Sequence, residues 1–341
     1  MVSITVKGLA SDSQILIGES IDNLSKYIPG RGIFIITDSN IHRIYSSRFP
    51  QARVFVTEPG EGAKTIESSA QIYRWLLEQG ADRSSFIVGI GGGVVCDLAG
   101  YIASTFMRGL GFGFVATSLL AQVDASVGGK NGINLDGYKN TIGTFNQPKF
   151  VICDTSMLKT LPREEYCNGL AEIVKHALIC DAPKFNFIEA NIHKILSLNS
   201  EAMEYLVTRS VQIKADIVQA DERERGERRK LNLGHTWGHA IEKVDKIPHG
   251  QAVSIGLALA SELSVRKGLM TPAQRERLLL LLTQLGLPTT TQTSLDILFQ
   301  ALIKDKKKEQ DILYFVLMEG IGSTVVAPIP VTELNPNQSL W

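Results

Sequence analysis

The sequence predicts two domains, an α/β domain over residues 1–160 with a doubly wound sheet and an all-α domain over residues 161–341. Three observations lead to this fold class. The 341 residues exceed what one small hydrophobic core usually serves. The first half alternates short β-branched runs with helical patterns, which is typical of an α/β sheet. Beyond about Pro162 the helical pattern dominates.

In the first half, apolar runs with β-branched residues predict the strands, and two helical patterns separate some of them. Because several of these runs are apolar throughout, we expect a parallel sheet that is covered on both faces. The expected strands are 2–7, 14–17, 33–37, 53–57, 86–90, 113–116 and 150–153, with helices at 66–79 and 94–106.

The second half carries apolar residues at helical spacing. Pro162 and Pro272 fit the first turn of a helix, the position that proline prefers. One segment, 312–317, has the pattern of a strand. The expected helices are 163–179, 184–196, 201–218, 235–244, 252–266, 272–285 and 295–304.

Composition limits the classes of function. Lys plus Arg and Asp plus Glu both number 35, so the net charge of zero gives no general attraction to nucleic acid or to anionic membranes. No apolar run reaches the roughly 20 residues of a membrane span, and the N-terminus lacks the pattern of a secretory signal. The four cysteines form no CxxC pair. We therefore expect a reduced, cytoplasmic protein without nucleic-acid or membrane partners.

A glycine turn follows the strand at 86–90. Gly91, Gly92 and Gly93 lie between this strand and a helix, where backbone N–H groups favour a phosphate. The spacing is not the GxGxxG dinucleotide motif, and a tight turn that needs positive φ is the alternative. Asp38, at the end of another strand, either accepts from a ribose hydroxyl or caps a helix.

Histidines and carboxylates predict a metal site. His235 and His239 are four residues apart on one helix face, and His249 precedes a long apolar helix. Glu172 belongs to a further helix. Two histidines and a carboxylate, with a fourth position open, are typical of catalytic zinc. We expect His235 and His249 as ligands, and spacing alone leaves Glu172 and His239 as alternatives for the third.

Several cations are open to two interpretations. Singly, each is an ordinary solvated residue, although lysines in glycine-rich loops also reach phosphates or carboxylates. The run 222–230 alternates in sign as exposed loops do, and 304–308 is typical of a solvated helix end. Outside these runs, the cations with these two interpretations are Arg108, Lys130, Lys139, Lys175 and Lys214.

Ordered motifs run through most of the chain. They are EGAK at 61–64, GGGVVCD at 91–97, FMRG at 106–109, VDASVGGK at 123–130, KN at 139–140, FNQPK at 145–149, AEIVKH at 171–176, NLGHTWGHAIE at 232–242 and HGQAV at 249–253. In this order they resemble the 3-dehydroquinate synthase family. The chain departs from the family pattern at Cys96, where glycine is usual, at 116–118, where Ala-Thr-Ser replaces Pro-Thr-Thr, and at Gln251, where glutamate is usual.

The resemblance implies a Rossmann-like NAD-binding domain and a helical metal- and substrate-binding domain. It implies Glu172, His235 and His249 as zinc ligands, with Co²⁺ as a possible substitute, and it moves His239 to phosphate binding or proton handling. The implied NAD contacts are Asp38, Asn40, Glu61, Lys64, Gly92, Gly93, Val94, Asp97, Thr117, Ser118, Lys139 and Thr160. The implied catalytic residues are Asp124, Lys130, Asn140, Lys175 and His239, and the implied substrate-binding residues are Arg108, Lys139, Lys214, Arg228, Asn232 and Lys306.

The resemblance also implies a reaction. It is the conversion of 3-deoxy-D-arabino-heptulosonate 7-phosphate to 3-dehydroquinate and phosphate, a lyase step of the shikimate pathway to aromatic amino acids. Transient oxidation by NAD, loss of phosphate, re-reduction, ring opening and aldol closure would follow in turn. A homodimer is implied as well. The alternatives are a cyclase for a sugar phosphate without a carboxylate, a metal-dependent polyol dehydrogenase, and a non-enzymatic metal- or nucleotide-binding protein.

Overall fold

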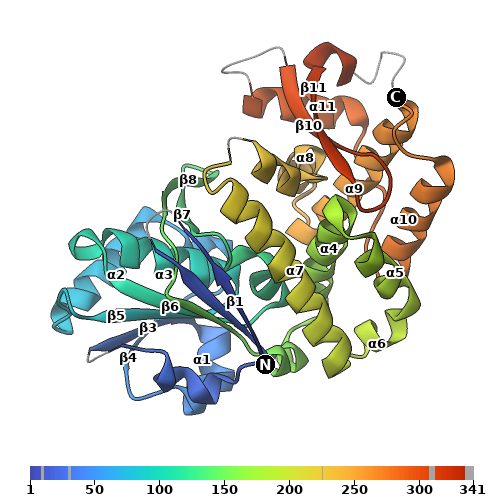
Figure 1. The fold of residues 1–341 in the computed structure, drawn as a ribbon. Coiled ribbons are helices and arrows are strands. Elements are labelled where there is room, and N and C mark those ends of the chain that lie inside the picture. Colours follow the sequence, from blue (N-terminus) through green and yellow to red (C-terminus); the bar gives the residue numbers. More distant parts are fainter. Residues whose placement is uncertain (9–10, 30–31, 225, 307–311, 335–341) are drawn as a thin grey trace. The chain divides into compact units, whose positions relative to one another are not determined.

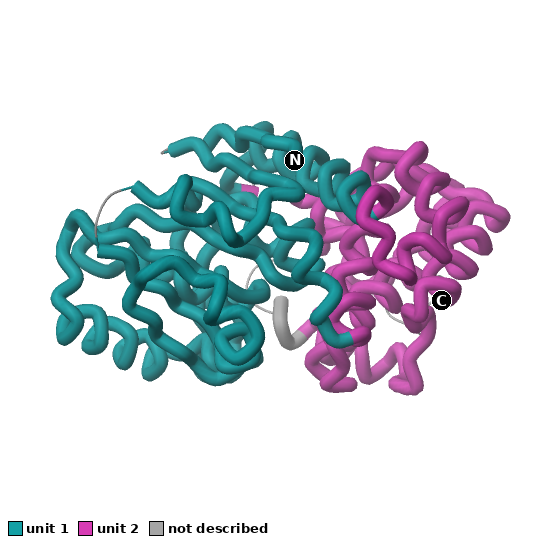
Figure 2. Tube along the Cα trace, turned by 90° about the horizontal axis from the view of Figure 1, so that it is seen from below, with its two compact units in different colours: residues 1–162, 203–223 teal, residues 163–202, 224–341 magenta. Residues whose placement is uncertain are grey.

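The structure, a computed structural model, describes residues 1–8, 11–29, 32–224, 226–306 and 312–334, except for the side chains of residues 304–306. The chain divides into two compact units (Figure 2). The first unit comprises residues 1–162 and 203–223, and the second comprises residues 163–202 and 224–341. The boundary expected between residues 160 and 161 stays a prediction. The structure adds that residues 203–223, most of them in helix α7 (Ser200–Ala220), belong to the first unit.

The first unit contains a seven-stranded sheet with the order β1-β2-β9-β6-β5-β3-β4. Figure 1 labels several of these strands. β1 pairs with β2 in antiparallel fashion, and the other pairs are parallel. The sheet therefore has the doubly wound α/β character that the sequence predicts. The strands are β1 (Val2–Val6), β2 (Ser13–Ile17), β3 (Ile33–Asp38), β4 (Arg53–Thr57), β5 (Phe86–Gly91), β6 (Gly111–Ala116) and β9 (Phe150–Cys153).

Both faces of this sheet are covered. Phe86, Val88 and Ile90 of β5 pack into a cluster of buried side chains with Ile21 and Met157, which lie in short 3₁₀ turns. The alternate residues of β5 face α3, where a Cβ at Gly89 would lie 2.9 Å from the Ala99 side chain. This alternation is what a strand buried on both faces requires. The helices of the sheet region are α1 (Ser39–Tyr45), α2 (Ile66–Glu78) and α3 (Gly93–Thr105).

A separate hairpin, β7 (Lys130–Leu135) and β8 (Tyr138–Phe145), packs against α3. From the sequence, lysine-bearing loops are expected in this segment, and the structure shows a hairpin instead. Ahead of the hairpin, residues Ala121–Ala125 form one turn of π-helix, a feature that often marks functional sites.

The second unit is mainly helical, with α9 (His249–Arg266) in contact with α4, α8 and α10. It also holds the hairpin of β10 (Ile312–Met318) and β11 (Thr324–Pro330), of which the sequence predicts only the first strand. The sequence does not predict β11, because Pro328 and Pro330 lie in it and proline disfavours a strand. The other helices are α4 (Arg163–Cys180), α5 (Ala182–Ala190), α6 (Ile192–Leu196), α8 (His235–Asp245), α10 (Pro272–Gln284) and α11 (Leu295–Lys306). No described helix is both long and apolar enough to cross a membrane.

Small residues let α9 approach its neighbours closely. A Cβ at Gly250 would lie 2.3 Å from the Cα of Asn168 in α4, and a Cβ at Gly256 would lie 1.9 Å from the carbonyl oxygen of Gly234, just before α8. Real Cβ atoms do not come this near to backbone atoms. The start of α8 and the first turns of α9 are therefore held together by backbone contact.

We predict that Gly256→Ala destabilises the protein. Alanine favours a helix over glycine by about 1 kcal/mol, but relief of the clash with Gly234 must move α8 away from α9. We expect a net loss of about 3 kcal/mol in the free energy of unfolding, measured by urea denaturation of metal-free protein. Gly62→Ala is the control, because no atom lies within 4 Å of a Cβ there. Equal stability of the two variants would contradict the close approach.

Candidate functional sites

A group of three side chains that could hold a metal ion lies in the second unit. Glu172 comes from α4, His235 is the first residue of α8 and His249 is the first residue of α9. The three offer ligand atoms that all lie within 4.8 Å of one another. Nε2 of His235 and Nε2 of His249 each lie 3.5 Å from Oε1 of Glu172.

The local backbone explains why both histidines begin helices. Gly234 precedes α8 with φ 77°, a left-handed conformation that glycine adopts without strain. Pro248 precedes α9 and cannot continue a helix backwards, since it lacks an N–H group. His235 and His249 therefore both lie at helix starts, with Nε2 of each beside Glu172 of α4.

Each histidine is oriented through its other ring nitrogen. Nδ1 of His235 lies 3.1 Å from the carbonyl oxygen of Leu233, and Nδ1 of His249 lies 3.1 Å from Oε2 of Glu242. Such partners fix the ring and leave Nε2 as the ligand atom. Glu242 belongs to the NLGHTWGHAIE motif, but the sequence alone suggests no role for it.

The charges of the group are strongly coupled. Glu172 is fully buried and forms an ion pair with Lys175, one turn further along α4, which is also buried. Burial lowers the pKa of His235 to about 3, and the Lys175 cation adds to this effect. Burial acts in the same direction on His249, but hydrogen bonds to Glu172 and Glu242 outweigh it and raise the pKa of His249 to about 9.

The donor set fits a divalent transition metal. One carboxylate and two imidazoles are ligands that zinc and cobalt accept, and three protein ligands leave a position for substrate. Ligand atoms at about 2.0–2.1 Å in a tetrahedron lie roughly 3.4 Å apart, close to the 3.5 Å between Glu172 and each histidine. His239 is exposed, and its ring centre lies 5.3 Å from that of His235. Among the described residues, it does not join this group of three.

The first unit holds the glycine turn. β5 ends at Gly91, Gly92 precedes α3, and no side chain caps this helix start. The backbone N–H groups there suit a phosphate. The turn is close to its neighbours, because a Cβ at Gly92 would lie 3.3 Å from Oγ of Ser118 and one at Gly93 would lie 3.0 Å from Cβ of Ala125. Val94 lies in the first turn of α3, and the N–H of Thr117 donates to the Gly91 carbonyl at 2.9 Å.

Beside this helix, Lys64 is the centre of a polar cluster. Its buried Nζ lies 2.7 Å from Oδ2 of Asp97, 2.6 Å from Oδ1 of Asn140 and 3.5 Å from Oε1 of Glu61. Burial raises the pKa of Asp97, and the Lys64 cation opposes this change. The structure therefore brings together four residues from three separate motifs, with Glu61 and Lys64 both from EGAK at 61–64.

A second ion pair in the first unit joins Lys214 of α7 to the π-helical turn. Nζ of Lys214 lies 2.7 Å from both the carboxylate and the carbonyl oxygen of Asp124. Lys130 and Lys139 are exposed on the β7–β8 hairpin, and Arg108 is exposed in a left-handed turn with φ 72°.

The remaining candidates have varied environments. Asp38 caps α1, accepting from the N–H of Ile41 at 3.0 Å, and Asn40 lies in the first turn of that helix. The Thr160 and Tyr45 hydroxyls are 2.7 Å apart. Nδ2 of Asn232 donates to Glu224 at 2.6 Å, and Arg228 is buried. The Lys306 side chain lies outside the described residues.

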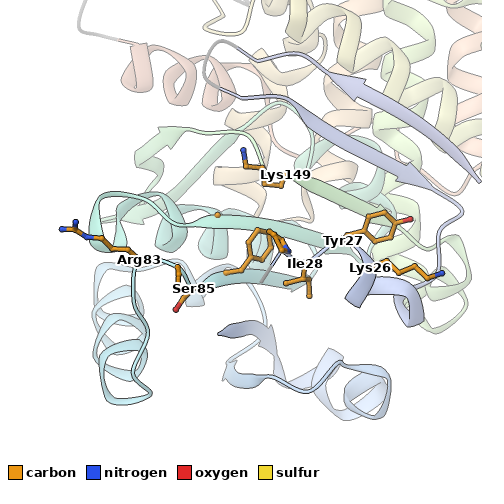
Figure 3. A pocket seen from close by; sticks show the side chains of 10 residues that line it. Lys26, Tyr27, Ile28, Arg83, Ser85 and Lys149 are labelled. Atoms are coloured by element: carbon orange, nitrogen blue, oxygen red, sulfur yellow. The ribbon is translucent and has the colours of Figure 1, made fainter. Parts of the chain in front are cut away.

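The first unit also has a hollow of about 500 Å³ at the amino ends of β5 and β6, the edge of the sheet opposite the glycine turn. The residues that line it include Phe86 and the cations Lys26, Arg83 and Lys149. These three cations point away from one another (Figure 3). The hollow therefore does not present a convergent anion site.

The pKa of His249 leads to a prediction about metal binding. At about pH 6 the metal-free protein carries a proton on His249, whose pKa is about 9, and none on His235, whose pKa is about 3. A metal that binds Nε2 of His249 must displace that proton. We predict release of about one proton per zinc and an affinity that rises from about pH 6 to about pH 9.

Titration calorimetry in buffers of different ionisation enthalpy measures this release. Working near pH 6 limits the contribution of zinc-bound water, whose pKa is about 7. Glu242→Gln should release fewer protons, since His249 loses a carboxylate partner. A binding enthalpy that is independent of the buffer would rule out a protonated His249.

Comparison with known proteins places the chain in a family. Residues 54–168 match the model of the N-terminal region of 3-dehydroquinate synthase, and residues 169–308 match the model of its C-terminal region. The 3-dehydroquinate synthase of Halorhodospira halophila is 41% identical over 322 residues, which cover 91% of each chain.

Two similar solved structures carry both cofactors. The 2-epi-5-epi-valiolone synthase of Streptomyces hygroscopicus subsp. jinggangensis 5008, with NAD⁺ and Zn²⁺ bound, is 27% identical, with a TM-score of 0.87 over 98% of this chain and 97% of that one. A 2-deoxy-scyllo-inosose synthase complexed with carbaglucose-6-phosphate, NAD⁺ and Co²⁺ is 26% identical, with a TM-score of 0.86 over 97% of each chain. From its family models and its relatives, this chain belongs to the 3-dehydroquinate synthase family.

Proposed function

We propose that the protein is a 3-dehydroquinate synthase that converts 3-deoxy-D-arabino-heptulosonate 7-phosphate to 3-dehydroquinate and phosphate. The observation that carries this proposal is the group of Glu172, His235 and His249, a three-ligand metal site in a chain of this family. The activity makes the chain a metal- and NAD-dependent lyase of the shikimate pathway. A homodimer stays a prediction from the family resemblance, and a cytoplasmic location stays a prediction from the sequence.

In the second unit, Glu172, His235 and His249 would hold Zn²⁺ or Co²⁺. The bound ion supplies a Lewis acid that binds substrate hydroxyls and lowers their pKa. Glu242 and the Leu233 carbonyl keep the two imidazoles in the orientation for binding. Lys175 compensates part of the negative charge of Glu172, and its ammonium is also proposed to attract the substrate's phosphate, together with Lys130 and His239.

In the first unit, we assign NAD to the glycine turn and the Lys64 cluster. NAD held there would supply reversible hydride transfer. Gly92, Gly93 and Val94 would place backbone N–H groups against its pyrophosphate. The carboxylates of Asp38, Glu61 and Asp97 would accept hydrogen bonds from ribose hydroxyls. The other proposed NAD contacts are Asn40, Lys64, Thr117, Ser118, Lys139 and Thr160.

The substrate carries a carboxylate and a phosphate, whereas the protein has no net charge. Local cations must therefore supply the attraction. We assign the carboxylate to Arg228, whose guanidinium can form two parallel hydrogen bonds with it. Asp124 and Asn140 are proposed to contact reacting hydroxyls. Arg108, Lys139, Lys214, Asn232 and Lys306 complete the proposed substrate set.

A cyclase for a sugar phosphate without a carboxylate is the second candidate function. It is favoured by the high structural similarity to the valiolone and inosose synthases. Such a cyclase would not need an arginine that binds a carboxylate, so Arg228 would have no partner on its substrate.

A direct assay tests the proposed function. Purified protein with NAD⁺, zinc and 3-deoxy-D-arabino-heptulosonate 7-phosphate should release phosphate and form 3-dehydroquinate in equal amounts, with no net NADH. Chelation of the metal should abolish both products, and added zinc or cobalt should restore them. Phosphate release from a carboxylate-free sugar phosphate alone would assign the second function instead. Net NADH from a polyol would indicate a dehydrogenase.

Arg228→Ala should lower kcat/KM by about 100-fold or more, because a charge-assisted pair with a carboxylate contributes about 1.5–3 kcal/mol and its loss leaves a charge poorly paired. Arg229→Ala is the matched control. The guanidinium of Arg229 stacks on the Tyr314 ring at 4.4 Å, and no contact with substrate is proposed for it. Steady-state kinetics of both variants provide the comparison. An unchanged kcat/KM in Arg228→Ala would refute the carboxylate assignment.

A further inference from the structure

Asn134 lies at an irregularity of the β7–β8 hairpin. The strands pair in register from Lys130 opposite Phe145 to Ile133 opposite Ile142, and the register shifts between Ile133 and Leu135. Asn134 therefore leaves the ladder, and its backbone N–H donates to the carbonyl oxygen of Lys64 at 2.8 Å. Bulges of this kind turn a side chain in a new direction and are frequent beside active sites.

The Asn134 side chain uses both ends of its amide. Nδ2 donates to Oε1 of Glu61 at 2.8 Å, and Oδ1 accepts from the backbone N–H of Asn140 at 2.9 Å. Asn140 has φ 53°, a left-handed conformation that is uncommon for residues with a side chain, although asparagine adopts it more readily than most. Asn134 thus ties the turn at Glu61 to the left-handed backbone at Asn140.

Glu61 and Asn140, the two residues that bond to Asn134, also both contact the ammonium group of Lys64. Nζ of Lys64 lies 2.6 Å from Oδ1 of Asn140 and 3.5 Å from Oε1 of Glu61. The contacts form a closed ring through Asn134, Glu61, Lys64 and Asn140. A ring of this kind fixes the position of each polar group more firmly than a single hydrogen bond does.

We propose that Asn134 is a positioning residue of the NAD site, and this inference rests on the proposed function. It acts through Glu61 and Asn140, and no contact between Asn134 and the cofactor is required. Loss of the amide donor would release the Glu61 carboxylate, and loss of the amide acceptor would release the left-handed turn at Asn140. Preorganised groups bind a ligand more tightly because less ordering remains to be done on binding.

Asn134→Asp separates these two roles. The carboxylate keeps an acceptor for the Asn140 N–H but places a second negative charge against Glu61. Two carboxylates at hydrogen-bond distance raise the pKa of one of them, and protonation restores a donor. The defect should therefore be large near pH 8 and smaller near pH 6, a pH dependence that a purely structural role would not produce.

Titration calorimetry of zinc-loaded protein with NAD⁺ tests the proposal. We expect the Kd of Asn134→Asp to rise about 10- to 100-fold near pH 8, and to fall back toward the wild-type value near pH 6. Asn23→Asp is the matched control, since Nδ2 of half-buried Asn23 donates to Glu19 at 2.8 Å in the same unit. The control should bind NAD⁺ as the wild type does. Equal affinities for both variants would overturn the positioning role.

Hydrogen–deuterium exchange of cofactor-free protein separates this inference from the proposed function. Asn134→Ala should speed exchange at the Asn140 amide at least several-fold, whereas Asn134→Asp, which keeps the acceptor, should leave it slow. Unchanged exchange in Asn134→Ala would refute the role of Asn134 even if the wild type binds NAD⁺. Failure of the wild type to bind NAD⁺, with the exchange pattern as expected, would reject the cofactor assignment and with it the claim that Asn134 serves NAD.

Discussion

The carboxylate of Glu172 has no exposed surface in the middle of α4, and a buried charge must be compensated by its neighbours or be lost. Lys175 supplies one cation from the same helix, and His235 and His249 lie on the other side of the carboxylate. These histidines reach it only because α8 and α9 begin close to one another, where Gly256 lies against the backbone of Gly234. The packing of the second unit and its metal chemistry thus depend on the same few contacts. A metal ion that replaces the proton on His249 would complete the compensation of charge.

The first unit also compensates a buried charge, but there the buried charge is a cation. There a buried cation, Lys64, gathers Asp97, Asn140 and Glu61 from a helix, a hairpin and a short turn. Lys214 does the same on a smaller scale by joining α7 to the π-helical turn at Asp124. In each case one charge holds together segments that are distant in sequence, because leaving it unpaired in the interior would cost several kcal/mol. A protein with no net charge can therefore still hold clusters of buried charged residues, because each charge in them is paired.

The sequence predicts the sheet well, since β5 is apolar throughout and runs into the glycine turn. Other features depend on contacts that spacing does not reveal. The β7–β8 hairpin resembles loops because most of β8 is exposed and lacks a buried alternate face. Pro328 and Pro330 conceal β11. Spacing leaves Glu172 and His239 equivalent as ligands, whereas the structure groups Glu172 from a different helix with His235 and His249. The spacing of residues does not predict roles for Glu242 and Asn134. Glu242 contacts His249 only because α8 and α9 meet at a short connection, and Asn134 acts from a bulge in the β7–β8 hairpin.

We propose that Glu172, His235 and His249 together bind the catalytic metal. Anomalous diffraction at the zinc edge, from crystals grown with zinc, tests this assignment. We expect one strong peak about 2.0–2.2 Å from a Glu172 oxygen and from Nε2 of His235 and of His249, with His239 outside the coordination sphere. A peak bound by His235 and His239, with Glu172 still paired only to Lys175, would contradict it.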